Sequence, residues 1–379
     1  MDFGLTDDQK ALIEKVKTFC REEVEPIAAE IDLKGIFPDD VIRKIGAMGL
    51  NGMIAPRPYG GMGLDTVTYA MVIEELSRAS ASVSTTVSVN NSLVCYTLDK
   101  FGTEEQKRKY LVPLANGSAI GSFAVTEPTA GTDASAIETT AKREGDHYIL
   151  NGTKIFITNA GKSRTALIFA MTDKEKGLKG ISSFIVDTSS EGFVIGKLED
   201  KMGIRGSQQA QIFFENLKVP AENLLGKEGE GFKIAMTAID CGRIGIAAQA
   251  VGIAQAAMDD SIKYAKERQQ FGRSICDFQA IQWKISEMAT LTSAARYLAY
   301  RAAWKKDRGD RFTMDASMAK LFASDVAMRV TREAIQVHGG HGYMKGSNVE
   351  RFFRDAKITE IYEGTSEVQK IVISRELLR

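Results

Sequence analysis

Residues whose types and spacing could carry out chemistry gather in four loops of this 379-residue chain. The first loop, Phe123 to Asp133, runs from a strand-like segment into a Pro-Thr-Ala-Gly turn that is rich in backbone donors. The second, Lys154 to Gly161, places the Phe156 ring and the Thr158 hydroxyl two residues apart, and therefore on the same side of a strand. On composition alone, these two loops are best interpreted as strand ends with turns.

The other two loops lie toward the C-terminus. The third, Gln336 to Tyr343, is a predicted helix end opened by glycines. The fourth, Ile361 to Glu367, carries Glu363 directly before Gly364 and just ahead of a predicted final helix. A carboxylate is a poor base for a C–H proton unless its surroundings raise its pKa, as burial does.

Several common catalytic signatures are absent from the sequence. Gly340-x-Gly342 and Gly229-x-Gly231 both lack the third glycine of a dinucleotide-binding fingerprint. A P-loop is excluded because Phe156 stands where its first glycine is required. His338 and His341 are three residues apart, so a metal site is conceivable, but a structural or cofactor-side role is favoured. No G-x-S-x-G elbow offers a serine nucleophile.

Composition narrows the function classes further. Basic and acidic residues both number 49, so no single-sign field is available to hold nucleic acid or an anionic membrane. The four cysteines form no C-x-x-C pair, which favours a reducing compartment over a disulfide framework or zinc site. The N-terminus lacks the features of a targeting peptide, and no apolar run approaches the ~18 residues that span a bilayer. We therefore expect a cytoplasmic protein without a membrane span.

The elements that must position these loops follow an α–β–α order. Apolar periodicity predicts helices through residues 1–120, beginning with a capping box at Thr6 and Gln9 and a first helix that Pro26 stops, and continuing near 39–48, 66–79, 84–100 and 104–116. Residues 121–228 carry short β-rich runs without long helices between them, which predicts an antiparallel barrel or sandwich. These runs are 122–126, 147–150, 154–158, 166–172, 182–187, 193–199 and 211–217. Residues 229–379 return to helices, at about 231–268, 277–308, 315–338 and 365–378, with small residues spaced for close packing. The fold class is therefore α+β, with three domains.

Taken together and in this order, the four loops resemble the acyl-CoA dehydrogenase family. The resemblance runs from Leu5 to about Leu378 and includes the motifs Val125-Thr-Glu-Pro128, Gly152-x-Lys-x-Phe-Ile-Thr-Asn159, Arg268-x-x-Phe-Gly272 and Ile361-Tyr-Glu-Gly-Thr365. It implies a helical N-terminal domain, a middle β-domain and a C-terminal four-helix bundle. It also implies FAD between the β-domain and the bundle.

The resemblance also implies the binding residues. The side chains that would line the flavin are Phe123, Val125, Thr126, Thr132, Phe156, Ile157 and Thr158, with the Thr158 hydroxyl pointing at flavin N5. The pyrophosphate and adenine of a neighbouring subunit's FAD would meet Arg268, Phe271, Gln279, Gln336, Val337, His338, Gly339 and Gly340, and a further cofactor contact would come from Thr365, Ser366 and Glu367. The acyl-CoA would be contacted by Thr132, Asp240, Arg243, Tyr362 and Gly364.

By the same resemblance, Glu363 removes the α-proton of a thioester while flavin N5 accepts the β-hydride, giving the trans-2-enoyl-CoA. Some relatives place the base near position 242, but this chain has Gly242 there. Ser88 to Leu93 resembles the short-chain, butyryl-CoA type, and no arginine lies between Arg78 and Lys100 to meet a dicarboxylic substrate. The sequence departs from the family at Gln208 and Gln209, where many relatives carry small hydroxyl residues.

The family resemblance further implies a homotetramer that passes electrons to an electron-transfer flavoprotein, in fatty-acid β-oxidation. Two alternatives stay open. One is an oxygen-using flavoprotein of the same fold, either an oxidase or a monooxygenase. The other is a catalytically silent CoA-binding scaffold.

Overall fold

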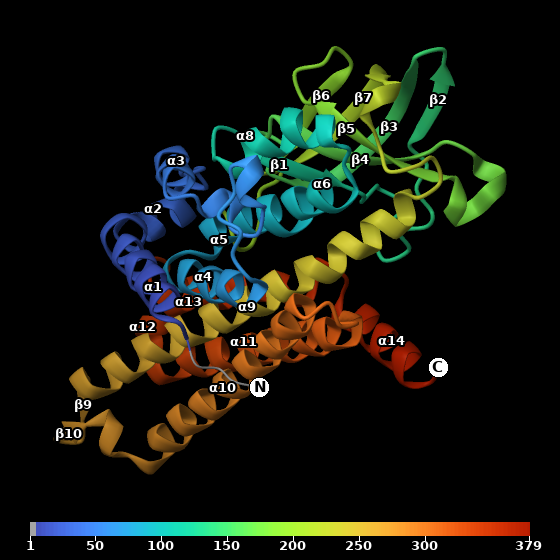
Figure 1. Ribbon diagram of the computed structural model, residues 1–379. Helices are drawn as coiled ribbons and strands as arrows, with labels where there is room; N and C mark the ends of the chain where they lie inside the picture. The colour runs from blue at the N-terminus through green and yellow to red at the C-terminus, as the bar shows by residue number, and fades with distance from the viewer. Residues whose placement is uncertain (1–4) are drawn as a thin grey trace.

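The computed structural model describes residues 5–379 and shows three parts in chain order: helices, a sheet, and long helices (Figure 1). The helices of the first part are α1 Asp7–Phe19, α2 Glu25–Lys34, α3 Asp39–Ala47, α4 Thr66–Ala79, α5 Ala81–Ser88, α6 Tyr96–Phe101, α7 Glu104–Gln106 and α8 Val112–Ala115. π-helical turns at Cys20–Val24, Val89–Cys95 and Lys107–Leu111 join several of them.

The chain begins as predicted, but the prediction for Pro26 is wrong. The Thr6 hydroxyl accepts from the Gln9 backbone N–H, and the Gln9 side chain accepts from the Thr6 N–H, so the capping box is confirmed. Pro26 does not stop the helical segment, because the π-turn leads straight into α2 and Pro26 lies in its first turn. A proline there removes an N–H that has no intrahelical acceptor, so the helix tolerates it.

The middle part is one eight-stranded sheet in the order β6-β7-β3-β2-β4-β5-β8, with β1 beside β4. Its strands are β1 Gly121–Ala124, β2 Thr140–Glu144, β3 His147–Thr158, β4 Thr165–Met171, β5 Ile181–Asp187, β6 Phe193–Leu198, β7 Gln209–Pro220 and β8 Leu224–Leu225. Most neighbours are antiparallel, as predicted, but β4 runs parallel to both β1 and β2. The runs predicted as two strands at 147–150 and 154–158 form the single strand β3, which two register shifts interrupt.

The third part is built on three long helices, α9 Gly231–Glu267, α10 Gln279–Asp307 and α11 Thr313–His338. The shorter α12 Gly340–Tyr343, α13 Asn348–Lys357 and α14 Ser366–Leu377 complete it, and a two-stranded ribbon, β9 Gln269–Gln270 with β10 Arg273–Ser274, joins α9 to α10. Small residues bring helices together as expected: a Cβ added at Gly252 would overlap the backbone oxygen of Glu74 in α4.

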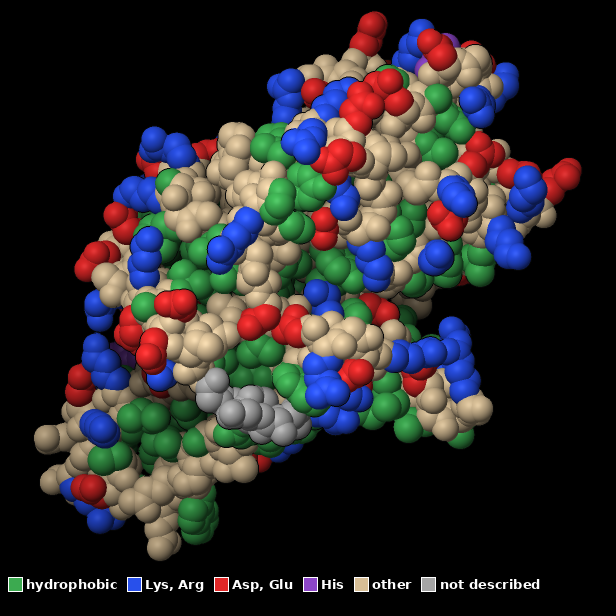
Figure 2. All heavy atoms as spheres, viewed as in Figure 1, with side chains coloured by type: hydrophobic (Ala, Val, Ile, Leu, Met, Phe, Trp, Pro, Cys, Tyr) green, Lys and Arg blue, Asp and Glu red, His purple; other side chains and the backbone are tan. Residues whose placement is uncertain are grey.

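Helix α9 connects the parts, since it packs against α4, α10, α11 and α13 and touches β5 (Figure 1). It corrects the expectation about apolar runs, because it is long and apolar enough to cross a bilayer. However, 78% of its apolar window is buried inside the fold, which makes it a core helix. Over the face drawn in Figure 2, cationic and anionic side chains are interspersed.

Candidate active site

A cavity of about 630 Å³ opens between the sheet and the C-terminal helices. Three of the four loops contribute to it: Thr126, Gly131 and Thr132 come from the first, Phe156 and Thr158 from the second, and the segment from Ile361 to Thr365 from the fourth. The rest of its wall comes from Glu199, Asp200, Lys201, Met202, Gly203, Ile204, Gln209, Arg354, Lys357 and Ile358. Residues more than 200 positions apart in sequence therefore share one chamber.

The Phe156 ring reaches this chamber through a backbone irregularity. Its φ is +59°, and the pairing of β3 with β7 shifts register between Lys154 and Ile157. A non-glycine residue at positive φ is uncommon and marks a locally strained turn. The Phe156 side chain is 61% exposed, so this chain presents an aromatic face that nothing of its own covers. A planar ring ligand could stack there.

A buried ion pair holds the first loop against β3. The Lys154 ammonium is fully buried and donates to a carboxylate oxygen of Glu127 at 2.7 Å and to the backbone oxygen of Val125 at 3.0 Å. Glu127 in turn accepts from the backbone N–H of Thr139 at 3.1 Å. The backbone oxygen of Thr126 accepts from Ile155 N–H. Thr126 is thereby fixed at the cavity wall.

Glu363 lies in a strained turn that several buried side chains hold. Its φ is +57° and that of Gly364 is +91°. The Lys320 ammonium donates to the backbone oxygen of Gly364 at 2.8 Å. Gln369 Nε2 donates to the same oxygen at 2.7 Å and to the backbone oxygen of Glu363 at 3.3 Å. Arg243 Nε donates to the backbone oxygen of Glu363 at 3.4 Å. The turn is therefore preorganised by donors from α9, α11 and α14.

The carboxylate of Glu363 is poised as a base. Its Oε2 is buried and has no hydrogen-bond partner among the described residues. Burial raises the pKa of Glu363 to about 7, and the nearby positive charges of Arg243 and Lys320 oppose that rise. A carboxyl group with a pKa near neutrality combines a deprotonated fraction at physiological pH with a strong affinity for a proton. This is the electrostatic setting of a general base.

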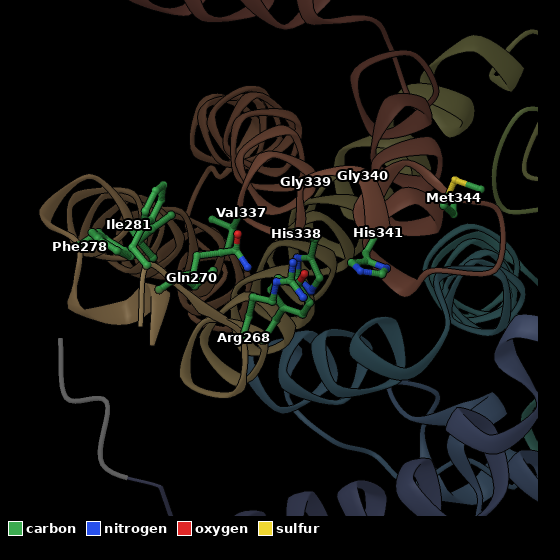
Figure 3. A pocket seen from close by; sticks show the side chains of 13 residues that line it. Arg268, Gln270, Phe278, Ile281, Val337, His338, Gly339, Gly340, His341 and Met344 are labelled. Atoms are coloured by element: carbon green, nitrogen blue, oxygen red, sulfur yellow. The ribbon is translucent and has the colours of Figure 1, made fainter. Parts of the chain in front are cut away.

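A second cavity, of about 750 Å³, lies near the ribbon of β9 and β10 (Figure 3). The predicted cofactor residues that line it are Arg268, Phe271, Val337, His338, Gly339 and Gly340. Phe271 is 94% exposed, whereas His338 stacks on Tyr264 with ring centroids 4.3 Å apart. The two cavities share no lining residue, and Figure 1 places the ribbon at the end of the bundle away from the sheet. Within one chain, the predicted cofactor residues therefore lie in two separate sites.

The other predicted site residues lie outside both cavities. Val125 and Ile157 are buried in the core, and Phe123 packs against Phe169. Gln279 begins α10, Gln336 is in the last turn of α11, and Ser366 and Glu367 begin α14.

Asp240 and Arg243 form a partly buried ion pair with N and O 2.7 Å apart. Arg243 is only 5% exposed and also reaches Ser317. In this chain, therefore, its guanidinium points to the Glu363 turn rather than to open solvent.

Sequence reasoning missed Lys320 and Gln369 as supports of the Glu363 turn. A signal for Lys320 was present: it lies in the same helical stripe as Ala316, Ala319 and Ala323, all fully buried. A lysine among such residues must lie next to an acceptor or a negative charge.

Comparison with known proteins decides the family. Domain profiles described as the N-terminal, middle and C-terminal domains of acyl-CoA dehydrogenase match residues 6–118, 122–217 and 229–378. The chain belongs to the acyl-CoA dehydrogenase family. It is 52% identical, over all of both chains, to the short-chain-specific acyl-CoA dehydrogenase of Clostridium acetobutylicum. It is 49% identical to the butyryl-CoA dehydrogenase of Megasphaera elsdenii, whose structure matches over 100% of both chains with a TM-score of 0.99.

A further solved structure comes from work on the electron transferring flavoprotein of Acidaminococcus fermentans. Its matching chain is 52% identical to this one, with a TM-score of 0.99 over all of both chains. Membership confirms the predicted family, the three-part fold and an FAD-dependent oxidoreductase. The residues present fit that cofactor, because the first cavity offers an uncovered aromatic face with hydroxyls beside it. The second cavity offers Arg268, whose guanidinium suits a pyrophosphate.

Proposed function

We propose that this acyl-CoA dehydrogenase converts a short-chain acyl-CoA to its trans-2-enoyl-CoA, with Glu363 removing the α-proton. The observation that carries the proposal is the Glu363 carboxylate: it lines the cavity, its Oε2 is buried without a partner, and its pKa is raised to about 7. No other glutamate or aspartate lining this cavity combines these properties among the described residues.

The backbone around Glu363 supports the same role. Its N–H has no acceptor among the described residues, so it is free to bind a ligand oxygen. A thioester oxygen bonded there would gain charge as the α-proton leaves, and a fixed donor stabilises that charge. Gly364 suits this turn because its φ is +91° and a Cβ there would meet Gln369 Nε2 at 2.8 Å. The Lys320 and Gln369 bonds hold the turn, so the donor and the carboxylate keep one relative position.

FAD supplies the acceptor for the β-hydride when it is bound. For its ring we propose the wall made by Thr126, Thr132, Phe156 and Thr158. The Phe156 ring would cover one face of the isoalloxazine and exclude water from it. Because Arg268 and the segment 336–340 lie away from this wall, we propose that they contact the cofactor of a neighbouring subunit.

A short acyl chain is favoured by Tyr362, whose side chain closes the cavity beside Glu363. The Tyr362 hydroxyl donates to Gln249 Oε1 in α9. Gln249 Nε2 donates to Thr85 Oγ1 at 2.7 Å, to Ala81 O at 3.0 Å and to Ser84 Oγ at 3.1 Å. This network ties Tyr362 to α5 and fills the space into which a longer chain would extend.

We further propose a homotetramer, with domain boundaries at 1–120, 121–228 and 229–379. An electron-transfer flavoprotein is the proposed electron acceptor, supported by the relative whose structure is described with one. The four cysteines are free, which supports work in the reducing cytoplasm. The proposed context is β-oxidation of fatty acids.

The variant Glu363→Gln tests the proposed function. Glutamine keeps the size of the side chain but cannot take a proton, so anaerobic flavin reduction by butyryl-CoA should slow by at least about 100- to 10,000-fold. FAD content and binding of a non-reducible thioester should persist. Reduction within threefold of the parent would show that another residue is the base. Oxygen consumption by the parent with substrate would point to the oxidase alternative instead.

A further inference from the structure

One polar side chain at the cavity wall has no role in the proposed function. It is Gln209, the first residue of β7. Gln209 pairs with Thr158 across the β3–β7 ladder and is only 6% exposed. Both residues line the cavity. An amide group here is thus fixed beside the hydroxyl that the cofactor ring would meet.

The direction of the hydrogen bond decides what the Thr158 hydroxyl can do. Gln209 Nε2 donates to Thr158 Oγ1 at 3.2 Å and to Ser207 Oγ at 3.1 Å. A hydroxyl has a single proton and two acceptor lone pairs. Because the amide fills one lone pair of Thr158, the hydroxyl proton is directed away from Gln209, on the side where the cavity lies.

We propose that Gln209 is a positioning residue that makes the Thr158 hydroxyl a hydrogen-bond donor to the cofactor ring in this cavity. The inference rests on the proposed placement of FAD and deepens it. It concerns only the second loop and β7, and it is independent of Glu363 and of the proton-transfer step.

The unpartnered end of Gln209 argues against a purely structural role. Its Oε1 is buried and has no partner among the described residues. An unpartnered buried acceptor destabilises the folded state. A serine or threonine could bond to its neighbours without leaving such an atom. Stability therefore does not explain the glutamine, whereas control of the Thr158 proton does.

A directed donor has a measurable consequence for a bound flavin. Hydride transfer places a hydrogen on flavin N5, where the Thr158 hydroxyl is expected to point, so a donor held there bonds the oxidised form more strongly than the reduced form. Gln209 should therefore lower the reduction potential of the bound cofactor and tighten the binding of oxidised FAD. Neither quantity depends on turnover.

The experiment compares four variants of the full chain: Gln209→Met, Thr158→Val, the double variant, and Gln208→Met as a matched control on the adjacent residue. Apoprotein is titrated with FAD, and the absorption spectrum and midpoint potential of the bound flavin are recorded with the melting temperature. Gln209→Met should weaken FAD binding about three- to tenfold, the effect of one hydrogen bond. It should also raise the potential and alter the flavin absorption bands, while Gln208→Met changes none of these.

The double variant separates positioning from direct contact. If Gln209 acts through Thr158, adding Gln209→Met to Thr158→Val changes affinity, spectrum and potential no further. A parent-like spectrum and affinity in Gln209→Met, or an undiminished effect in the Thr158→Val background, would overturn the proposal. Should Gln209→Met fail to fold, Gln209→Thr serves in its place. Failure of the parent to bind FAD at all would instead reject the proposed function.

Discussion

Gly242 of α9 faces the Glu363 carboxylate so closely that a Cβ added to it would overlap Oε2. Position 242 is also where the family resemblance implies that some relatives place the base. In this structure, the absence of a side chain at 242 is what makes room for the glutamate of the fourth loop. The two positions therefore occupy one space, which only one of them can fill.

This relationship predicts the effect of Gly242→Ala. The methyl group should push the carboxylate away from the substrate position and slow flavin reduction about 10- to 100-fold, since small misplacements of reacting groups are costly. FAD affinity should stay unchanged, because the proposed ring wall lies on the sheet. Combined with Glu363→Gln, the alanine should slow the reaction no further. A rate equal to that of the parent would mean that the Glu363 carboxylate reaches the substrate from another conformation.

The raised pKa of Glu363 predicts the pH profile. The base must be deprotonated, so kcat/KM should fall as pH drops below about 7, the value to which burial raises this pKa. Stability should change in the opposite sense: a carboxyl whose folded-state pKa is raised stabilises the fold most at low pH and loses that contribution as pH rises toward 7. Denaturant melts of the parent and of Glu363→Gln from pH 4.5 to 7.5 should therefore diverge, with the variant increasingly the more stable. Parallel curves would place the Glu363 pKa near its usual value.

Lys320 should matter through both its charge and its hydrogen bond. Burial lowers its own pKa to about 7, and the charge of Glu363 opposes that fall. In Lys320→Met the pKa of Glu363 loses one of the two cations that hold it down, so the acid limb of kcat/KM should move to higher pH. Gly364 would keep only the Gln369 bond, so kcat should also decrease. The exposed Lys370→Met is the control, and an unmoved acid limb in Lys320→Met would contradict this account.

The sequence predicted the helices and strands whose apolar residues repeat at a clear period. It missed elements that lack such a repeat or that lie between glycine-rich segments. Helix α4 matches its predicted bounds, because its apolar residues repeat at helical spacing. Strand β2 was missed because four of its five residues are exposed and polar or charged. Helix α13 was missed although Val349, Phe352 and Ala356 form a buried stripe, since glycine-rich segments surround it.

The candidate site divides in the same way. Glu363, Phe156 and Thr158 were predicted from motif resemblance, and they do share one cavity. The bulge that turns Phe156 outward depends on backbone geometry, and the supports Lys320 and Gln249 depend on contacts between residues 40 or more positions apart. Local pattern carries no signal for the bulge or for the partners of Gln249, and for Lys320 it indicates burial without identifying the acceptor. A lysine is among the least expected residues in a core.

The network around Tyr362 predicts how chain-length preference could be changed. Gln249→Ala removes the acceptor of the Tyr362 hydroxyl and opens space toward α5. The ratio of kcat/KM for octanoyl-CoA over butyryl-CoA should then rise about tenfold or more, because each buried methylene contributes ~0.8 kcal/mol. Exposed Gln282→Ala in α10 is the matched control. An unchanged ratio would show that the acyl chain does not extend toward Gln249.

The division of the cofactor residues between two cavities predicts complementation between subunits. Take one subunit type with Glu363→Gln and intact Arg268, and a second with Arg268→Ala and intact Glu363, each expected to be nearly inactive alone. In a mixed oligomer, a site that takes Glu363 from the second type and Arg268 from the first is complete. Co-expression with two different tags, followed by tandem purification, should therefore recover a substantial part of the parent's activity per flavin.

If Arg268 instead serves the cofactor of its own chain, every site in the mixture carries a defect and activity stays at the level of the two single variants. Mixing the separately purified homo-oligomers without subunit exchange is the control and should recover nothing. A monomeric protein that holds one FAD per chain would contradict both this prediction and the proposed tetramer.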